Sequence, residues 1–194
     1  GNLLGDEQSG HVAALGFELY IRMLEEEVES LRAQSEREAP EAAVRLDLDV
    51  DAYVPAEYIP FEAAKIDVHR RVSAAREPGE LRELADELRD RFGPLPEALE
   101  NLIALQRARI EFARAGATAV EARGGRLTVS PVALESEEAA AVTERVDGAL
   151  YEWREKALSV RVPAEAAARL GAAVALAEAL AEVRPEPARE PVAG

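Results

Sequence analysis

Residues 80–96 read ELRELADELRDRFGPLP, and this stretch sets the character of the fold. Its apolar residues recur at three- and four-residue steps, the spacing of one face of an α-helix. They are Leu81, Leu84, Ala85, Leu88 and Phe92. Gly93 can take the left-handed conformation that ends a helix, and Pro94 cannot continue one. The stretch therefore predicts an amphipathic helix from about Glu80 to Phe92, whose apolar face needs a core.

Helical periodicity continues on both sides of this stretch. The other helices predicted in the body of the chain span residues 61–75, 96–115, 135–151 and 163–183. The second of these has a core stripe made of Leu99, Leu102, Ile103, Ile110 and Ala113. A further amphipathic helix is predicted from Val12 to about Ala33. Its stripe packs either on its own domain or on a neighbouring domain.

Period-two alternation predicts strands over residues 44–50 and 158–162. Two short β-prone runs, 118–122 and 126–129, flank Gly124-Gly125 and predict a hairpin. The sum is an α+β fold, in which a helical N-terminal arm precedes a domain of several helices packed on a small, largely antiparallel sheet. The expected divisions are an arm over residues 1–38, a domain over residues 41–183 and a flexible, proline-containing tail over residues 184–194.

Composition excludes several classes of function. The chain has 194 residues, no cysteine and a formal net charge of −15 at pH 7. The lack of thiols excludes disulfides, thiolate metal sites and cysteine nucleophiles. The net negative charge disfavours nucleic-acid binding over the surface as a whole. The sequence contains neither a run of 18 apolar residues nor a secretory signal, so we expect a cytoplasmic protein.

Motifs for catalysis and metal binding are missing from the sequence. There is no Gly-x-x-x-x-Gly-Lys-Ser/Thr phosphate loop, and Gly124-Gly125 fits a turn better than a phosphate cradle. His11 and His69 are far apart and have no metal-ligand spacing. We therefore expect no catalytic, cofactor-binding or metal-binding residue. The many carboxylates leave a small hydrolase as an alternative that no motif supports.

The polar face of the helix over residues 80–92 has two interpretations. Glu83, Glu87 and Asp90 fall on the arc opposite the apolar stripe, with Arg91 at its edge. Spacing alone favours an ordinary solvated face. The functional alternative is an acidic docking stripe for an arginine-rich partner surface.

Several stretches resemble one known family. The opening GNLLGDEQSGH, followed by GFELY at residues 16–20, resembles the end of the translocation motif of bacterial transcription-repair coupling factors (Mfd). RecG helicases share a looser version of that motif. The resemblance continues through residues 58–60, 65–71 and 87–96, in an order that Mfd has and RecG lacks. It covers residues 1 to about 116; beyond Thr118 only the alternation of strands and helices agrees. We therefore expect the sequence to begin inside a larger protein.

The resemblance implies a function for this part of the protein. Mfd-like proteins use ATP and magnesium to move on duplex DNA, displace stalled RNA polymerase and recruit UvrA through a UvrB-like module. This is transcription-coupled nucleotide excision repair. Their C-terminal domain docks on the UvrB-like module, masks UvrA binding and restrains the translocase. The chain would thus be an autoinhibitory interaction domain, not an enzyme, without a cofactor of its own.

The resemblance also implies roles for individual residues. The family's docking helix carries Glu-Leu-x-Asp-Arg-Phe-Gly, which matches Glu87, Asp90 and Arg91 in this sequence. Gln8 matches a glutamine of the translocation motif that couples ATP-driven closure to the DNA grip. The ATPase motifs themselves are absent from this chain. We therefore expect that Gln8 cannot couple ATP hydrolysis to DNA binding within these 194 residues.

Two further expectations remain open. The alternative function is that of a DNA-contacting fragment of a RecG-like helicase, against which the net charge and the missing ATPase motifs count. If residues 12–31 lack a neighbouring domain, their apolar stripe folds back or pairs with a second copy. Such a dimer would be an artefact of the missing domain.

Overall fold

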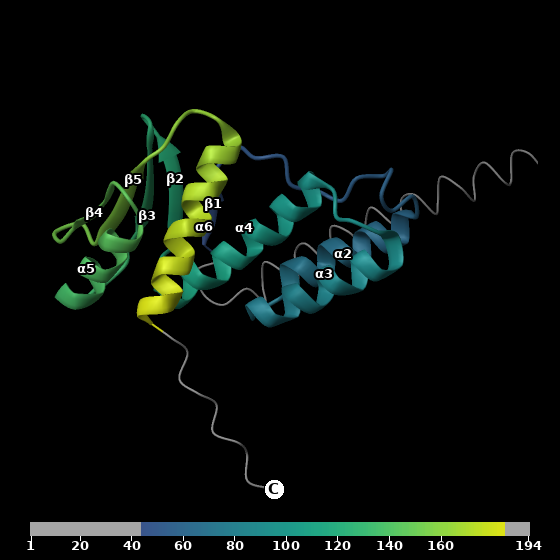
Figure 1. Ribbon diagram of the computed structural model, residues 1–194, viewed down its shortest axis with the longest axis horizontal. Coiled ribbons are helices and arrows are strands. Elements are labelled where there is room, and N and C mark those ends of the chain that lie inside the picture. Colours follow the sequence, from purple (N-terminus) through teal and green to yellow (C-terminus); the bar gives the residue numbers. More distant parts are fainter. Residues whose placement is uncertain (1–43, 185–194) are drawn as a thin grey trace, which may run out of the picture. The chain divides into compact units, whose positions relative to one another are not determined.

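The structure, a computed structural model, describes residues 44–184 (Figure 1). In chain order, its elements are β1 (Arg45–Asp47), α2 (Glu62–Ala74), α3 (Pro78–Phe92), α4 (Glu97–Arg114), β2 (Ala119–Arg123), β3 (Arg126–Ser130), α5 (Ser136–Arg145), β4 (Ala149–Glu152), β5 (Ala157–Arg161) and α6 (Ala166–Val183). The predicted arm over residues 1–38, with Gln8 and His11 and its helix from Val12 to about Ala33, lies outside the described residues. So does the tail from residue 185 onward.

The strands of residues 44–184 form one mixed sheet in the order β1-β2-β3-β5-β4. Its pairs are antiparallel except β1–β2, which is parallel with Leu46 opposite Val120. The β2–β3 connection is the predicted turn. Gly124 and Gly125 have φ of 60° and 72°, the positive-φ pair that a two-residue hairpin requires. The expected α+β class with a largely antiparallel sheet is confirmed.

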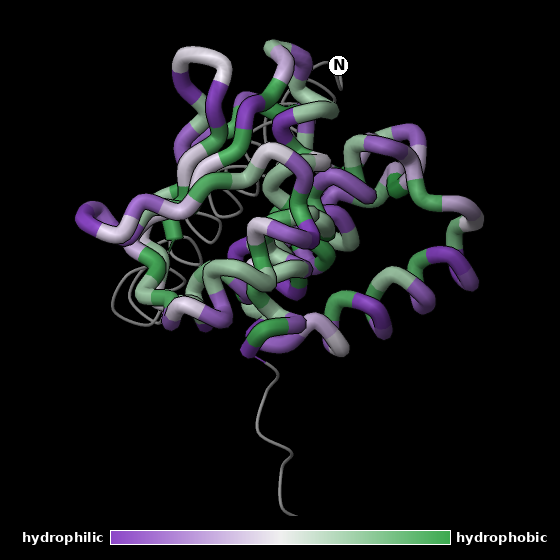
Figure 2. The backbone as a smooth tube through the Cα atoms, turned by 60° about the vertical axis from the view of Figure 1, so that its left-hand side comes forward, coloured by the Kyte–Doolittle hydropathy of each residue, from purple (hydrophilic) through white to green (hydrophobic). Residues whose placement is uncertain are grey.

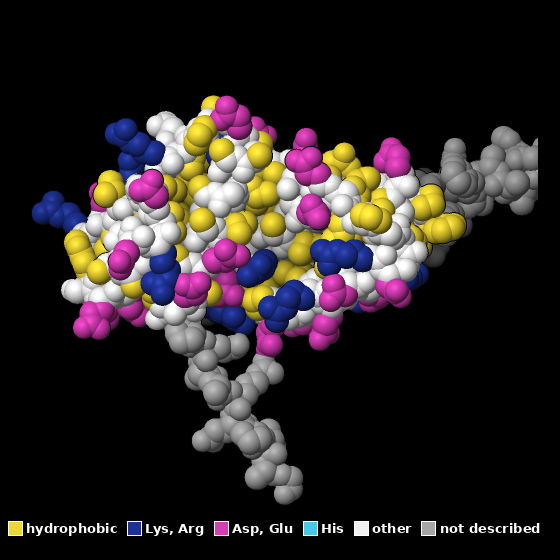
Figure 3. Space-filling view, in the orientation of Figure 1, with side chains coloured by type: hydrophobic (Ala, Val, Ile, Leu, Met, Phe, Trp, Pro, Cys, Tyr) yellow, Lys and Arg dark blue, Asp and Glu magenta, His cyan; other side chains and the backbone are white. Residues whose placement is uncertain are grey.

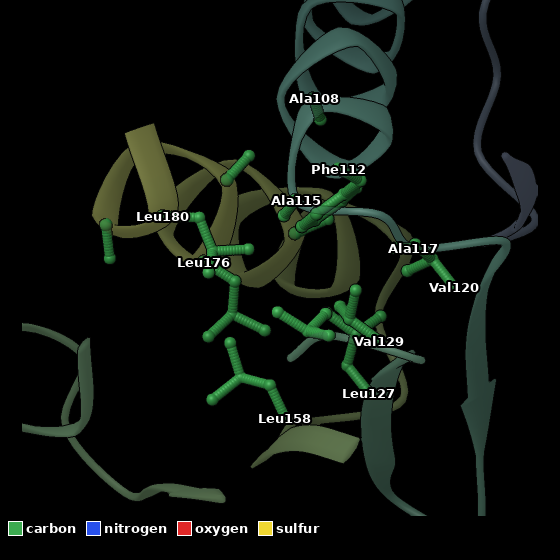
Figure 4. Packing of buried hydrophobic residues seen from close by; sticks show 14 of the residues in the cluster. Ala108, Phe112, Ala115, Ala117, Val120, Leu127, Val129, Leu158, Leu176 and Leu180 are labelled. Carbon is green, nitrogen blue, oxygen red and sulfur yellow. The ribbon is translucent and has the colours of Figure 1, made fainter. Parts of the chain in front are cut away.

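Helices α4, α5 and α6 contribute the apolar residues that pack against the sheet (Figure 1). Phe112, Leu127, Leu158 and Leu176 are fully buried and belong to one cluster (Figure 4). Burying one such side chain stabilises the fold by roughly 1.5–3 kcal/mol. Figure 2 shows hydrophilic and hydrophobic residues alternating along the helices, as expected when one face of each is buried.

A second core lies where α2, α3 and the loop before α2 pack on α4. Ile59, Leu81, Leu88 and Leu99 are at most 1% exposed in this cluster. The predicted apolar face of α3 is confirmed, because its leucines point into this core. Helix α4 contributes residues to both cores and so connects the sheet to the α2–α3 pair.

The shared role of α4 also explains one wrong prediction. Ala113, expected in the core stripe, is exposed, whereas Phe112 beside it is fully buried. Because α4 serves two cores, its buried surface is wider than one stripe. The side towards the sheet runs through Ala108 and Phe112.

The helix predicted over residues 135–151 is wrong in its second half. Helix α5 ends at Arg145, Gly148 takes φ of 73°, and β4 follows. Strand β4 pairs antiparallel with β5, with Tyr151 opposite Leu158. The helical spacing of this segment is therefore overridden by a pairing with residues that come later in the chain.

Some boundaries also differ from the sequence prediction. Strand β1 covers three residues, not 44–50, because Asp49 takes φ of 50° and interrupts the extended backbone. Helix α3 begins two residues early, at Pro78, since proline is favoured in the first turn of a helix. Helix α6 begins at Ala166 and not at Pro163.

Candidate functional site

The C-terminal end of α3 is held by its own backbone and by Tyr58. Gly93 has φ of 89°, and its N–H donates to the carbonyl of Arg89 at 2.9 Å. The Tyr58 hydroxyl lies 2.9 Å from the carbonyl oxygen of Leu88 and 2.8 Å from that of Gly93, so its one proton is shared between them. Burial raises the pKa of Tyr58 further above neutral pH, and its protonated hydroxyl is the donor in both contacts. The last turn of α3 is thereby anchored to the loop before α2.

Glu87 forms an ion-pair cluster with two arginines. Its Oε1 accepts from Arg71 Nη1 at 3.0 Å and from Arg91 Nη1 at 3.3 Å, and its Oε2 accepts from Arg71 Nη2 at 2.6 Å. The hydrogen bonds from Arg71 are the largest cause of the lowered pKa of Glu87, and the same contact raises the pKa of Arg71. The Glu87 carboxylate is therefore ionised and paired within the domain.

Asp90 and Arg91 differ from Glu87 in their exposure. Asp90 is exposed and forms no ion pair with any residue of the range 44–184. The side chain of Arg91 is 59% exposed, and its Cζ lies 5.1 Å from the centre of the Phe92 ring. Phe92 in turn contacts Tyr58, with ring centres 5.7 Å apart. A charged pair is thus displayed on a turn that aromatic packing holds in place. We call Glu87, Asp90 and Arg91 the α3 surface.

The structure modifies what the sequence suggested for the α3 surface. It brings Glu87 and Arg91 together, whereas Asp90 stands apart and faces solvent. Glu87, placed by spacing on the arc away from the core, is only 38% exposed because it lies on the flank that meets α2. Arg71 has no feature in the sequence that marks it as part of this cluster. No helical spacing rule could have found it, because the contact joins two helices.

The structure also gives a place to His69, the histidine that the sequence left without a metal-ligand spacing. His69 Nε2 lies 3.4 Å from the backbone nitrogen of Val54, whose N–H it accepts. Over residues 44–184, no three His, Asp or Glu side chains gather where a metal ion could bind. In the same range, no helix combines the length and apolarity needed to cross a bilayer.

One groove opens between α4 and α6. It has a volume of about 450 Å³ and is lined by alanine and valine side chains together with Arg107, Glu111, Glu178 and Glu182. Arg107 and Glu178 form an ion pair at 3.3 Å. Its lining residues include no serine, threonine, cysteine or histidine. Figure 3 shows acidic and basic side chains interspersed over the visible face, without one continuous basic field.

Comparisons with a family model and with individual proteins point to the same family. The family model of the TRCF domain matches residues 48–141. The transcription-repair-coupling factors of Mycobacterium bovis and Mycobacterium tuberculosis are each 38% identical over 182 residues, which is 89% of this chain. That of Staphylococcus haemolyticus is 38% identical over 130 residues, 67% of this chain. The chain spans only 15% of the mycobacterial proteins and 11% of the staphylococcal one.

A solved structure supports the fold. It is described as the crystal structure of the C-terminal domain of transcription-repair coupling factor. It matches with a TM-score of 0.63 and 20% sequence identity, over 73% of this chain and 94% of that chain. The α3 surface, Arg71 and Tyr58 all lie within the residues that the family model covers. The chain belongs to the transcription-repair coupling factor family, and residues 44–184 have the fold of the family's C-terminal domain.

Proposed function

We propose that residues 44–184 act as an autoinhibitory docking domain. In this proposal the α3 surface binds the UvrB-like module of the same protein. It thereby masks the site for UvrA and restrains the DNA translocase in transcription-coupled nucleotide excision repair. ATP, magnesium, duplex DNA and RNA polymerase would be bound by other parts of the whole protein. The cytoplasm, where a bacterium keeps its DNA and polymerase, is the location that this function requires.

The observation that carries the proposal is the geometry at the end of α3. The Asp90 carboxylate has no ion-pair partner within residues 44–184, and Arg91 exposes more than half of its side chain on a turn fixed by Gly93 and Tyr58. The Arg91 guanidinium is already held by Glu87 and Phe92, so it loses less side-chain entropy on binding, which favours a specific protein contact.

A RecG-like helicase fragment and a small hydrolase find less support. The named relatives are transcription-repair-coupling factors, and the net charge of −15 repels a phosphate backbone. A hydrolase would need a nucleophile or a perturbed acid–base pair in a cleft. The groove between α4 and α6 has no serine, threonine, cysteine or histidine among its lining residues, and each of its three glutamates is paired with an arginine.

The proposal is tested by titrating the 194-residue chain with a separately purified UvrB-like module. Asp90→Arg should weaken binding about tenfold, because a cation then faces the cation that Asp90 attracts. Glu144→Arg is the matched control. Glu144 is also an exposed carboxylate in the last turn of a helix, without an ion pair among residues 44–184. Equal dissociation constants for both variants and the unaltered chain would remove the α3 surface as the interface.

Charge reversal of Glu87 is a poor test of the same idea. Arginine at this position would stand beside Arg71 and Arg91, so three guanidinium groups would crowd between α2 and α3. Weaker binding could then arise from a disturbed helix pair and not from a lost contact. Asp90 lacks this complication because it holds no other described residue in place.

A further inference from the structure

We propose that Arg71 of α2 is a positioning residue of the α3 surface: it holds Glu87, and through Glu87 it orients Arg91. The surface then offers its partner the carboxylate of Asp90, which pairs with no residue of the described range, and the oriented guanidinium of Arg91. This inference rests on the proposed docking function and names the chemistry of the partner's face. That face carries a cation opposite Asp90 and a carboxylate or carbonyl oxygen opposite Arg91.

The contact between Arg71 and Glu87 is well suited to fixing a side chain. Two nitrogens of the Arg71 guanidinium reach the two carboxylate oxygens, at 3.0 and 2.6 Å. Such a two-point contact sets the plane and direction of the carboxylate, which one hydrogen bond does not. Arg71 lies in the last turn of α2. The orientation of the Glu87 carboxylate on α3 is therefore fixed by a contact with a second helix.

The acceptor capacity of Glu87 is nearly used up inside the domain. An ionised carboxylate has about four lone-pair sites. Arg71 and Arg91 direct three donors at them, at 3.0, 2.6 and 3.3 Å. Glu87 therefore has about one site left for a partner, so its main role is to hold Arg91.

The charges of the cluster lead to the same conclusion. Two guanidinium groups and one carboxylate leave the trio of Arg71, Glu87 and Arg91 with a formal charge of +1. A partner cation approaching Glu87 would meet this excess positive charge, whereas at Asp90 it meets a carboxylate that no other described residue neutralises. The surface thus fits a partner face of mixed charge better than the arginine-rich face that the sequence suggested.

Arg91 is also supported from its other side. Its guanidinium lies 5.1 Å from the Phe92 ring centre, a distance at which a cation is attracted to an aromatic face. Phe92 packs on Tyr58, which caps the end of α3. Glu87 and Phe92 together restrict Arg91, and only the first of these contacts depends on Arg71.

The positioning role can be measured on the 194-residue chain alone. Relaxation of the ¹⁵Nε–H group of Arg91 reports how ordered its guanidinium is on the picosecond–nanosecond scale. The order parameter should fall clearly in Arg71→Gln and fall less in Arg71→Lys, which keeps the charge but not the two-point contact. Asp86→Asn is the control, since it releases Arg89 from its 2.9 Å pair on the same helix. An unchanged Arg91 in Arg71→Gln would overturn the inference.

A binding cycle then tests the link to docking. Arg71→Gln should weaken binding of the UvrB-like module about fivefold in the unaltered background and scarcely at all in a Glu87→Gln background. An equal loss in both backgrounds would mean that Arg71 touches the partner directly, which also overturns the inference. All titrations are made well below the melting temperature, where circular dichroism finds every variant folded, so that a purely structural role leaves the dissociation constant unchanged.

The docking function and the positioning role of Arg71 are refuted by different results. If Asp90→Arg leaves binding unchanged, the docking function is wrong, and the partner chemistry inferred here is wrong with it. If Asp90→Arg weakens binding but Arg71→Gln does not, docking stands and the positioning role of Arg71 is refuted.

Discussion

Replacing Gly93 by alanine tests whether the backbone fixes the end of α3. Gly93 has φ of 89° and ψ of −166°, a region that is essentially restricted to glycine and costs other residues about 1–3 kcal/mol. A Cβ at this position would meet no other atom within 4 Å. The cost is therefore backbone strain, without a clash against the rest of the domain.

The strain is partly offset in the unfolded chain. Loss of glycine flexibility there favours folding by about 0.4–1 kcal/mol, so we expect a net loss of about 1–2 kcal/mol. For a folded region of this size, 1 kcal/mol corresponds to about 3–4 °C in Tm. Thermal unfolding followed by circular dichroism should thus give a Tm about 3–8 °C below that of the unaltered chain.

Other glycines supply matched controls. Gly79 and Gly171 lie inside α3 and α6, and neither has a positive φ or a close neighbour that a Cβ would strike. Alanine at either position should leave stability unchanged or raise it by up to about 1 kcal/mol, since alanine favours the helix. The sign of the effect therefore separates strain at Gly93 from a general response to added methyl groups.

Chirality offers a sharper version of the same test. The conformation of Gly93 is the mirror image of an ordinary extended one, so a D-residue adopts it without strain. A semisynthetic chain with D-alanine in place of Gly93 should melt close to the unaltered chain. If L-alanine is tolerated as well as D-alanine, the backbone at Gly93 relaxes freely, and the reasoning that it fixes the end of α3 is refuted.

Three further changes probe the remaining contacts. Tyr58→Phe removes the hydroxyl that caps the end of α3 and should cost about 1 kcal/mol in urea unfolding; no loss would mean that water replaces it fully. Phe112→Ala should cost about 3–5 kcal/mol, and a loss below about 1 kcal/mol would contradict its place in the first core. Stability should fall as the pH drops below 4.5, the ordinary pKa of Glu138. Arg184 holds this pKa lower in the folded state, so the unfolded chain takes up the proton first. Glu138→Gln should make the loss of stability at low pH less steep. The same dependence of unfolding free energy on pH in the variant and the unaltered chain would contradict a contribution from the Glu138–Arg184 pair.

Local patterns were sufficient to predict much of the fold. The leucine spacing of α3 and its Gly-Pro ending define a helix without reference to any other segment. The Gly124-Gly125 turn depends only on the two residues that it contains. The resemblance on residues 87–96 pointed to the family to which the named relatives belong.

Contacts between distant segments account for what the sequence did not reveal. Residues 149–152 continue a helical spacing, yet they form a strand because β5, later in the chain, pairs with them. Arg71 is one of many arginines, and nothing local marks it as the partner of Glu87. The parallel pairing of β1 with β2 likewise joins segments separated by three helices.

The most direct test of docking through the α3 surface is amide chemical-shift mapping of the ¹⁵N-labelled chain during titration with the UvrB-like module. The largest changes should fall on residues 86–94 and on the Nε–H of Arg91, with β5 unaffected. Changes confined to the sheet or to the groove between α4 and α6, with residues 86–94 unmoved, would contradict docking by α3.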